Sequence, residues 1–337
     1  MRAVTFAGPN IMTLRNYQRP EPQPGWIRIK VSSVGICGSD LHLLHATSFD
    51  NDGMRPGHEM AGIIDTVGDN VTLKTGQLIS VEPLMGCETC FSCSTGHLNR
   101  CSDFRIFGVH KPGAMADFIN VPAELAYSLP QNLDHGVASL CEPMAVVCRG
   151  VRLGHIQLGS RVAILGSGSI GLLSILAAKT AGASEIFVTS RYPKQAELAR
   201  LYGATEVFAN GNDLLQALGD KHIDVTLETV GGTANTLEEA CAFTRPGGDI
   251  VIMGIYEGNT GLPGYSFATK ELSLHGSSCY AHDSTESDFA VATRLVSANA
   301  EVLKHMITHK FHLDQAQLAF ETAADKSKGS IKVTILP

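Results

Sequence analysis

The pattern of hydrophobic and polar residues changes near Gly159. Before this position, short apolar runs are broken by Gly, Pro and Asp, which is typical of β-structure with irregular connections. In residues 26–31 the apolar residues alternate with polar ones, which predicts a strand with one buried face, and residues 63–67 form a second run. No segment up to about residue 130 has the pattern of a long amphipathic helix. The first part is therefore predicted to be rich in β-structure.

After Gly159 the pattern predicts strands that alternate with helices. Residues 162–165 are continuously apolar, as expected of a parallel strand buried on both faces. Gly182 and Gly203 mark the ends of two predicted helices. The remaining predicted elements are helices at 172–181 and 194–202 and strands at 186–189, 224–228, 249–253 and 331–336. This spacing favours successive βαβ units in a doubly wound parallel sheet.

Length and charge narrow the possible partners. A chain of 337 residues exceeds what one small core usually organises, so two domains are expected. The net charge of -7 argues against nucleic acid as a partner. No apolar run approaches the roughly 18 residues that span a bilayer, and the first residues lack the layout of a signal peptide. We therefore expect a cytoplasmic protein without a membrane or nucleic-acid partner.

Four of the nine cysteines are clustered. In a reducing compartment such a cluster indicates metal ligands rather than disulfides. Four thiolates at tetrahedral reach make a closed zinc site, which holds a loop and leaves no position for a substrate. The loop is otherwise polar, so packing alone does not explain four cysteines there. The predicted structural zinc ligands are Cys87, Cys90, Cys93 and Cys101.

Three other fragments carry donors for a second, open metal site. A thiol, an imidazole and a carboxylate, with water in the fourth position, form the ligand set that a catalytic zinc requires. There the metal acts as a Lewis acid on an alcohol oxygen. Taken singly, each of these His or Glu residues is more often structural. The fragments contribute Cys37, Ser39 and His42; His58 and Glu59; and Glu142.

A glycine-rich turn follows the first strand of the second part. Its glycines let the backbone approach a pyrophosphate at a helix N-terminus, where free N–H groups and the helix dipole favour an anion. The predicted nucleotide-binding residues of this turn are Gly166, Gly168, Ser169, Ile170 and Gly171.

The end of the next strand bears on the choice of nucleotide. It carries Ser190 and Arg191, where NAD-preferring proteins normally have an acid that binds the ribose 2′-hydroxyl. A serine hydroxyl and a guanidinium would instead bind a 2′-phosphate, which favours NADP(H) over NAD(H). The alternative is that Arg191 stacks on adenine or faces solvent and NAD is used.

Together the Cys-Gly-Ser-Asp at 37–40, the Gly-His-Glu at 57–59, the cysteine loop and the glycine-rich turn resemble the zinc-containing medium-chain dehydrogenases. The resemblance covers essentially the whole chain. It implies an α/β protein with a GroES-like, β-rich catalytic domain and a Rossmann doubly wound parallel-sheet cofactor domain. The implied boundaries are 1–150 with 279–337 for the zinc-binding catalytic domain, and 151–278 for the NAD(P)-binding domain.

The resemblance also assigns roles to residues of the open site. It implies that Cys37, His58 and Glu59 bind the catalytic zinc. Glu142 is followed by proline, as in the sorbitol and threonine dehydrogenases, and would bind zinc directly or through water; a one-residue shift in alignment would place a thiol, Cys141, there instead.

Two further residues would move the proton of the alcohol. Ser39 corresponds to the hydroxyl that takes this proton, and His42 to the imidazole that passes it to solvent. The alternatives are a helix N-cap for Ser39 and a surface histidine for His42. The Ser190-Arg191 pair also resembles the NADP-dependent bacterial secondary alcohol dehydrogenases.

The implied function is hydride transfer between a secondary alcohol or polyol and NAD(P), with two zinc ions per chain. Sugar alcohols, sugar acids and diols are the expected substrates, a threonine-type amino alcohol is the alternative, and a homodimer or homotetramer is expected. A zinc-free quinone or enoyl reductase shares the fold but lacks both zinc sites. A non-catalytic protein of the same fold would have lost ligands or glycines, and none is lost here.

Overall fold

The computed structural model describes residues 1–45, 53–219 and 222–337. The chain divides into two compact units. Unit 1 comprises Met1–Glu142 and Ala281–Pro337, and unit 2 comprises Pro143–Tyr280. The helix α4 (Cys141–Leu153) carries the chain from the first unit into the second. No helix within the described ranges is both long and apolar enough to cross a membrane.

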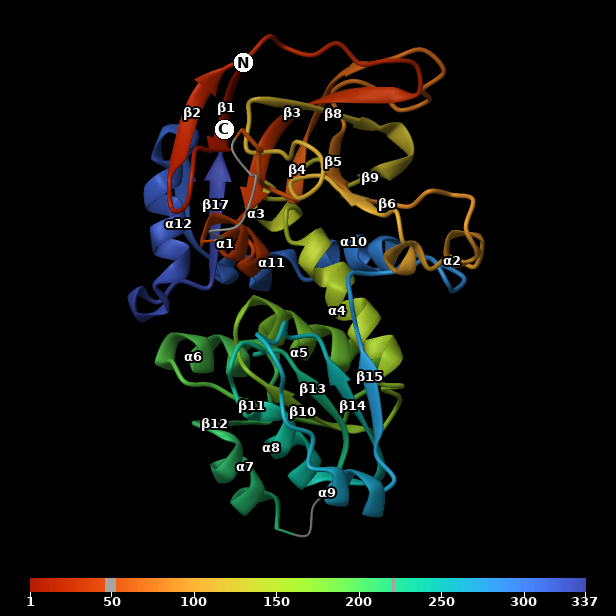
Figure 1. Ribbon diagram of the computed structural model, residues 1–337, viewed down its shortest axis with the longest axis vertical. Helices are drawn as coiled ribbons and strands as arrows, with labels where there is room; N and C mark the ends of the chain where they lie inside the picture. Colours follow the sequence, from red (N-terminus) through yellow and green to blue (C-terminus); the bar gives the residue numbers. More distant parts are fainter. Residues whose placement is uncertain (46–52, 220–221) are drawn as a thin grey trace. The chain divides into compact units, whose positions relative to one another are not determined.

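Unit 1 is built on a seven-stranded sheet with the order β16-β17-β3-β4-β5-β9, to which β8 is added beside β3 (Figure 1). Strands β3 and β4 form its centre and pair antiparallel, with two bulges in their register. Valine and isoleucine side chains from these strands fill a core that also receives residues of α12. The main strands are β3 (Trp26–Gly35), β4 (Glu59–Val67), β5 (Leu78–Val81), β8 (Phe118–Pro122), β9 (Ala126–Ser128), β16 (Ile307–His312) and β17 (Lys332–Leu336).

Short elements complete unit 1. Strands β1 (Arg2–Phe6) and β2 (Met12–Asn16) pair with each other, as do β6 (Leu84–Met85) and β7 (Arg105–Ile106). The helices are α1 (Gly38–His45), α2 (Phe91–Ser94), α3 (His135–Ala138), α10 (Asp288–Ala298), α11 (Ala300–Leu303) and α12 (Ala316–Ala324). The helix α1 begins directly after β3, so the end of a central strand positions the first candidate ligand segment.

Unit 2 is a six-stranded parallel sheet with the order β12-β11-β10-β13-β14-β15. This order reverses beside the first strand, which is the topology of a Rossmann nucleotide-binding fold. Figure 1 shows the strands in green to light blue with their connecting helices. The elements are β10 (Arg161–Leu165), β11 (Glu185–Thr189), β12 (Glu206–Phe208), β13 (Ile223–Glu228), β14 (Thr244–Ile252), β15 (Ser273–Gly276), α5 (Ser169–Ala181), α6 (Pro193–Tyr202), α7 (Gly211–Leu218), α8 (Thr236–Phe243) and α9 (Gly264–Thr269).

The predicted ends of two helices are confirmed in unit 2. The helices α5 and α6 end at Gly182 and Gly203, both with φ of 105°. Glycine occupies this left-handed conformation without the steric cost that a side chain would add. The short edge strands β12 and β15 were not predicted from the sequence.

Candidate functional site

The four clustered cysteines converge in the structure. Their ligand atoms all lie within 4.8 Å of one another. The short helix α2 begins after Cys90 and places Cys93 one turn later, while a backbone N–H of Cys87 lies 3.4 Å from the sulfur of Cys101. A Cβ atom at Gly86 would lie 2.6 Å from the sulfur of Cys93, so the chain needs glycine to pass this close.

The protonation of these thiols favours a bound cation. The hydroxyl of Thr89, with backbone N–H groups of the loop, lowers the pKa of Cys87 to about 6. Burial and hydrogen bonds with the neighbouring thiols raise the pKa of Cys93 to about 12. The two shifts favour a thiolate at Cys87 and a neutral thiol at Cys93, and a bound divalent cation would allow both to be thiolate ligands. Four sulfur donors in this arrangement fit a closed tetrahedral zinc site.

An ion pair between His282, which is exposed, and the buried Glu82 anchors the cysteine loop to the rest of unit 1. The backbone N–H of His282 donates to the carbonyl of Gly96 at 2.7 Å. The Nε2 atom of His282 lies 2.8 and 3.0 Å from the two carboxylate oxygens of Glu82, which is buried. The hydrogen bond with Glu82 raises the pKa of His282, although partial burial opposes this. The contacts of His282 thus hold the cysteine loop in place in addition to any metal bound by its four cysteines.

The predicted ligands of the open site also lie together. The ligand atoms of Cys37, His58 and Glu59 are within 4.8 Å of one another, although the residues come from two segments. Cys37 lies between β3 and α1, and Glu59 begins β4. Strands β3 and β4 are paired so that Glu59 is opposite Gly35, which brings the two segments together. A thiol, an imidazole and a carboxylate fit a catalytic zinc with one position left open.

Asp40, for which no role was predicted from the sequence, lies beside this ligand set. Its Oδ2 atom accepts a hydrogen bond from the backbone of Cys37 at 2.9 Å, and its Oδ1 atom lies 3.6 Å from Nδ1 of His58. At that distance the attraction is electrostatic, and neither atom has a hydrogen-bond partner within the described residues. Burial opposes the charged imidazole, but Asp40 and Cys37 outweigh it and raise the pKa of His58 well above its usual value. Asp40 therefore orients His58.

Lys332 was also missed as part of the site. Its ammonium lies 2.7 Å from both carboxylate oxygens of Glu59 and 3.3 Å from the carbonyl of Ile36. Both charged side chains are buried, with exposed fractions of 3% and 1%. Burial opposes the charge of Lys332, but Glu59 outweighs it and raises the lysine pKa. The predicted zinc ligand Glu59 thus already has a cationic partner in the protein.

Glu142 is buried close to this set but is not among the three groups within 4.8 Å of one another. Burial raises the pKa of Glu142 to about 7, Glu59 adds to the effect, and His58 and Lys332 oppose it. Cys141 begins α4 and is fully buried.

The two predicted proton-transfer residues lie on α1. Ser39 is half-buried in the first turn, and His42 is exposed three residues later. Residues at this spacing share one face of a helix. Ser39 and His42 therefore lie on one face of α1, with the half-buried Ser39 followed by the solvent-exposed His42.

The glycine-rich turn of unit 2 connects β10 to α5. Gly166 has φ of 95°, and a Cβ at Gly171 would lie 2.1 Å from the carbonyl oxygen of Gly166. Gly168 is the N-cap of α5, no side chain caps this helix end, and a Cβ there would meet nothing within 4 Å. Ser169 and Ile170 form the first turn of α5 and are half-buried. The helix N-terminus therefore has open space and backbone N–H groups for a phosphate.

Ser190 and Arg191 follow β11, as predicted. Ser190 is buried, and its hydroxyl accepts a hydrogen bond of 2.7 Å from Ser167 of the glycine-rich turn. Ser167 also donates to Gln195 of α6 at 3.0 Å. These hydroxyls join the turn to the end of the second strand, whereas Arg191 is exposed. Ser167 and Gln195 were not recognised in the sequence.

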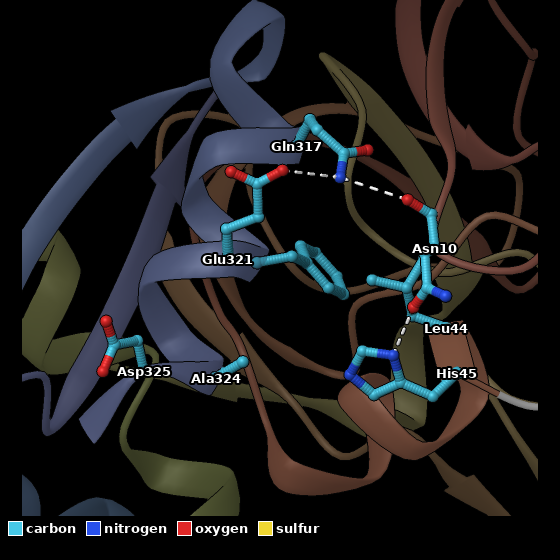
Figure 2. A pocket seen from close by; sticks show the side chains of 8 residues that line it. Asn10, Leu44, His45, Gln317, Glu321, Ala324 and Asp325 are labelled. Carbon is cyan, nitrogen blue, oxygen red and sulfur yellow. Dashed lines mark hydrogen bonds between the residues drawn. The ribbon is translucent and has the colours of Figure 1, made fainter. Parts of the chain in front are cut away.

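A separate pocket of about 500 Å³ opens beside α12 in unit 1 (Figure 2). The side-chain amide of Gln317 in its wall donates to the carbonyl of Asn10 at 3.1 Å and to the carboxylate of Glu321 at 3.0 Å. The residues predicted to bind zinc or nucleotide do not line it. The pocket is lined by Asn10, Leu44, His45, Gln317, Phe320, Glu321, Ala324 and Asp325.

Comparison with known proteins agrees with this geometry. Residues 23–131 match the family of alcohol dehydrogenase GroES-like domains, and residues 169–298 match that of zinc-binding dehydrogenases. Sorbitol dehydrogenase of Bacillus subtilis strain 168 is 31% identical over 349 aligned residues, which cover 100% of this chain and 97% of the relative.

Solved structures show the same fold. A protein of Sinorhizobium meliloti 1021, described as a zinc-binding dehydrogenase and bound to NADP, has a TM-score of 0.88 and 30% identity, covering 100% and 99% of the two chains. A protein of Escherichia coli CFT073, described as a short chain alcohol dehydrogenase in complex with NADH, has a TM-score of 0.90 and 25% identity over 100% and 99%. The chain belongs to the zinc-containing medium-chain dehydrogenases, in the branch of the polyol dehydrogenases.

Proposed function

We propose that this enzyme reversibly oxidises a secondary hydroxyl group of a sugar alcohol, sugar acid or diol to a ketone, with NADP(H) preferred over NAD(H). The observation that carries the proposal is the convergence of Cys37, His58 and Glu59 beside the buried Glu142. A thiol, an imidazole and a carboxylate are donors for an open zinc site, which suits a substrate oxygen. The similarity to sorbitol dehydrogenase supports a polyol as the substrate class.

Each residue of the open site has a proposed task. Cys37, His58 and Glu59 would hold the zinc ion, with Glu142 close by. Bound zinc supplies Lewis-acid chemistry, which lowers the pKa of an alcohol. Ser39 would accept the proton of the substrate hydroxyl, and His42 would pass it to solvent. Asp40 and Lys332 would orient His58 and Glu59 through the contacts described above.

We propose two zinc ions per chain, the second in the cysteine cluster. Metal analysis of protein purified without added chelator should give two zinc ions per chain, and Cys90→Ala should reduce this to one. A wild-type value of one or none would contradict the two-site proposal. By family analogy we also propose a cytoplasmic homodimer or homotetramer, with a mass in solution of two or four chains.

The preference for NADP(H) is proposed from Ser190 and Arg191. The end of β11 has no carboxylate to repel a 2′-phosphate, and the similarity to the NADP-bound structure is consistent with this. Arg191→Asp should weaken NADP binding much more than NAD binding. Arg200→Asp makes the same change of charge at an exposed position near the end of α6 and is the control. An unchanged ratio of the two affinities in Arg191→Asp would refute the assignment.

One panel of substrates tests the reaction itself. Sugar alcohols, sugar acids, diols and amino alcohols would each be offered with NAD and with NADP, and reduction of the nucleotide would be followed. We expect turnover with a polyol, sugar acid or diol and a higher kcat/KM with NADP. Turnover confined to an amino alcohol such as threonine, or no turnover by zinc-loaded enzyme, would overturn the substrate class.

A further inference from the structure

A third group of metal-binding side chains lies in unit 2, apart from the residues assigned above. The ligand atoms of His155, Asp249 and His275 are within 4.8 Å of one another. One carboxylate oxygen of Asp249 lies 2.7 Å from Nε2 of His275 and 3.7 Å from Nδ1 of His155. The two imidazole rings have centroids 5.5 Å apart. Two imidazoles therefore flank one carboxylate oxygen.

Close packing of α4 on the sheet brings His155 next to Asp249 and His275. A Cβ at Gly150 would lie 2.2 Å from the sulfur of Met253, and a Cβ at Gly154 would lie 2.8 Å from Val225. Glycine at both positions thus lets the helix approach β13 and β14. His155 follows with φ of 50°, a left-handed conformation that histidine adopts more readily than most residues.

The two strands supply the other groups from one face of the sheet. Val251 of β14 is paired with His275 of β15. Asp249 lies two residues before Val251, so its side chain is on the same face. The contact of Gly154 with Val251 shows that this is the face covered by the end of α4. The segment after α4 and the strands β14 and β15 therefore each supply one of the three side chains.

His155 and Asp249 lie toward the opposite end of the strands from the nucleotide turn. His155 and Asp249 line a depression of about 310 Å³ together with Ser160, which directly precedes β10. The glycine-rich turn follows the carboxyl end of β10. In the sheet register Asp249 is level with Val162 at the start of β10, and strands β13 and β14 lie between β10 and β15, which carries His275. Asp224 also lines the depression, but its carboxylate already forms an ion pair with Arg245, with 2.6 Å between Oδ1 and Nε.

A simple hydrogen-bonded pair explains only part of this arrangement. It accounts for Asp249 and His275 but not for the second imidazole, because 3.7 Å exceeds the range of a hydrogen bond. Ligands bound to zinc at bond lengths of about 2.1 Å in tetrahedral geometry are separated by roughly 3.4 Å. The separation of 3.7 Å between His155 and Asp249 is close to this value, and the 2.7 Å between Asp249 and His275 would need to lengthen by about 0.7 Å.

We propose that His155, Asp249 and His275 bind a zinc ion, with water completing its coordination. Nitrogen and oxygen donors of this kind suit zinc and the neighbouring divalent transition metals. The ion would join the end of α4 to β14 and β15. It would stabilise unit 2 and take no part in the reaction.

Zinc binding to the full-length enzyme tests this site. Protein would first be dialysed so that it keeps its tightly bound ions, and ZnCl₂ would then be added in a calorimetric titration. The wild type should bind one further ion. His155→Asn, which suits the left-handed conformation, and His275→Gln should each weaken this step by roughly tenfold or more. His305→Asn changes an exposed histidine of unit 1 and should leave the step unchanged.

A second measurement separates loss of a ligand from loss of the fold. Added zinc should raise the melting temperature of the wild type by mass action and should not raise that of His155→Asn. Without added zinc the two proteins should melt together, because the His155 side chain is 70% exposed. The proposal is overturned if the wild type binds no further zinc, or if His155→Asn and His275→Gln bind it as tightly as His305→Asn.

Discussion

Replacement of Lys332 by methionine would test how the buried charges of the open site are balanced. The ammonium lies 2.7 Å from both oxygens of Glu59, and the two side chains are 3% and 1% exposed. At an effective dielectric constant of about 20, unit charges 2.7 Å apart attract by roughly 6 kcal/mol, and removal from water offsets much of this. Removal of one partner from a buried pair typically costs about 3–5 kcal/mol, because the other charge stays buried alone.

We therefore expect Lys332→Met to lower the free energy of unfolding of zinc-free protein by about 3–5 kcal/mol. With zinc bound the loss should be smaller, because Glu59 then has a second cation nearby. Urea unfolding followed by tryptophan fluorescence suits this measurement. Trp26 is the only tryptophan and begins β3, so it reports on the unit that holds the pair.

The double variant Lys332→Met/Glu59→Gln is the matched control. It removes both charges and should recover a large part of the stability lost in Lys332→Met. A loss below about 1 kcal/mol in Lys332→Met would refute the reasoning, since it would fall in the range of an exposed pair. A double variant no more stable than the single one would refute it too, because the unpaired carboxylate would then not be the cause.

Three further predictions concern the two groups of predicted zinc ligands, the ion pair of His282 and the backbone at Gly108. Cys37→Ala should abolish turnover and leave the unfolding midpoint near that of wild type, whereas Cys90→Ala should lower the midpoint first; an equal loss of stability in both would contradict the division into open and closed sites. Glu82 raises the pKa of His282, so the pair stabilises the fold fully at pH values below about 6.5, the pKa of histidine in the unfolded chain. This stabilisation is lost as the pH rises through the higher pKa of His282 in the folded protein. The free energy of unfolding should fall over that interval in wild type and less in His282→Gln, and identical pH profiles would refute the ion pair. Gly108→Ala should cost more than about 1 kcal/mol in thermal or urea unfolding, because its Cβ would lie 2.8–2.9 Å from backbone atoms of the residue before His58. Gly8 also has a positive φ, but a Cβ there would meet nothing within 4 Å, so an equal cost for Gly8→Ala would mean that the contact at Gly108 has no effect.

The features predicted correctly from the sequence depend on neighbours along the chain. The strands and helices of unit 2 follow from runs of apolar residues and from glycines at the helix ends, as at Gly182. The missed edge strands β12 and β15 contain three and four residues. Such short segments carry no repeat, and their conformation depends on pairing with a neighbouring strand.

The groups that support the open site were not predictable in the same way. Lys332 was assigned to a strand, where a lysine is normally exposed. Its burial depends on Glu59, which is 273 residues away in the sequence. Asp40 is only three residues from Cys37, but its effect on His58 appears only once β3 and β4 are paired. Sequence motifs thus indicate the donors, whereas their counter-charges require the tertiary structure.

The pairing of β17 with β3 also sets an order for biosynthesis. A ribosome makes Met1–Glu142, then all of Pro143–Tyr280, and only then the strand that carries Lys332. Unit 2 is continuous in sequence, so it has all its strands before unit 1 does. Until β17 emerges, the end of β3 at Val34 and Gly35 lacks its β17 partner, although β8 already pairs with Trp26–Lys30, and Glu59 lacks its ammonium partner. Nascent chains stalled after unit 2 should therefore depend on chaperones, because an open strand edge can pair with other chains.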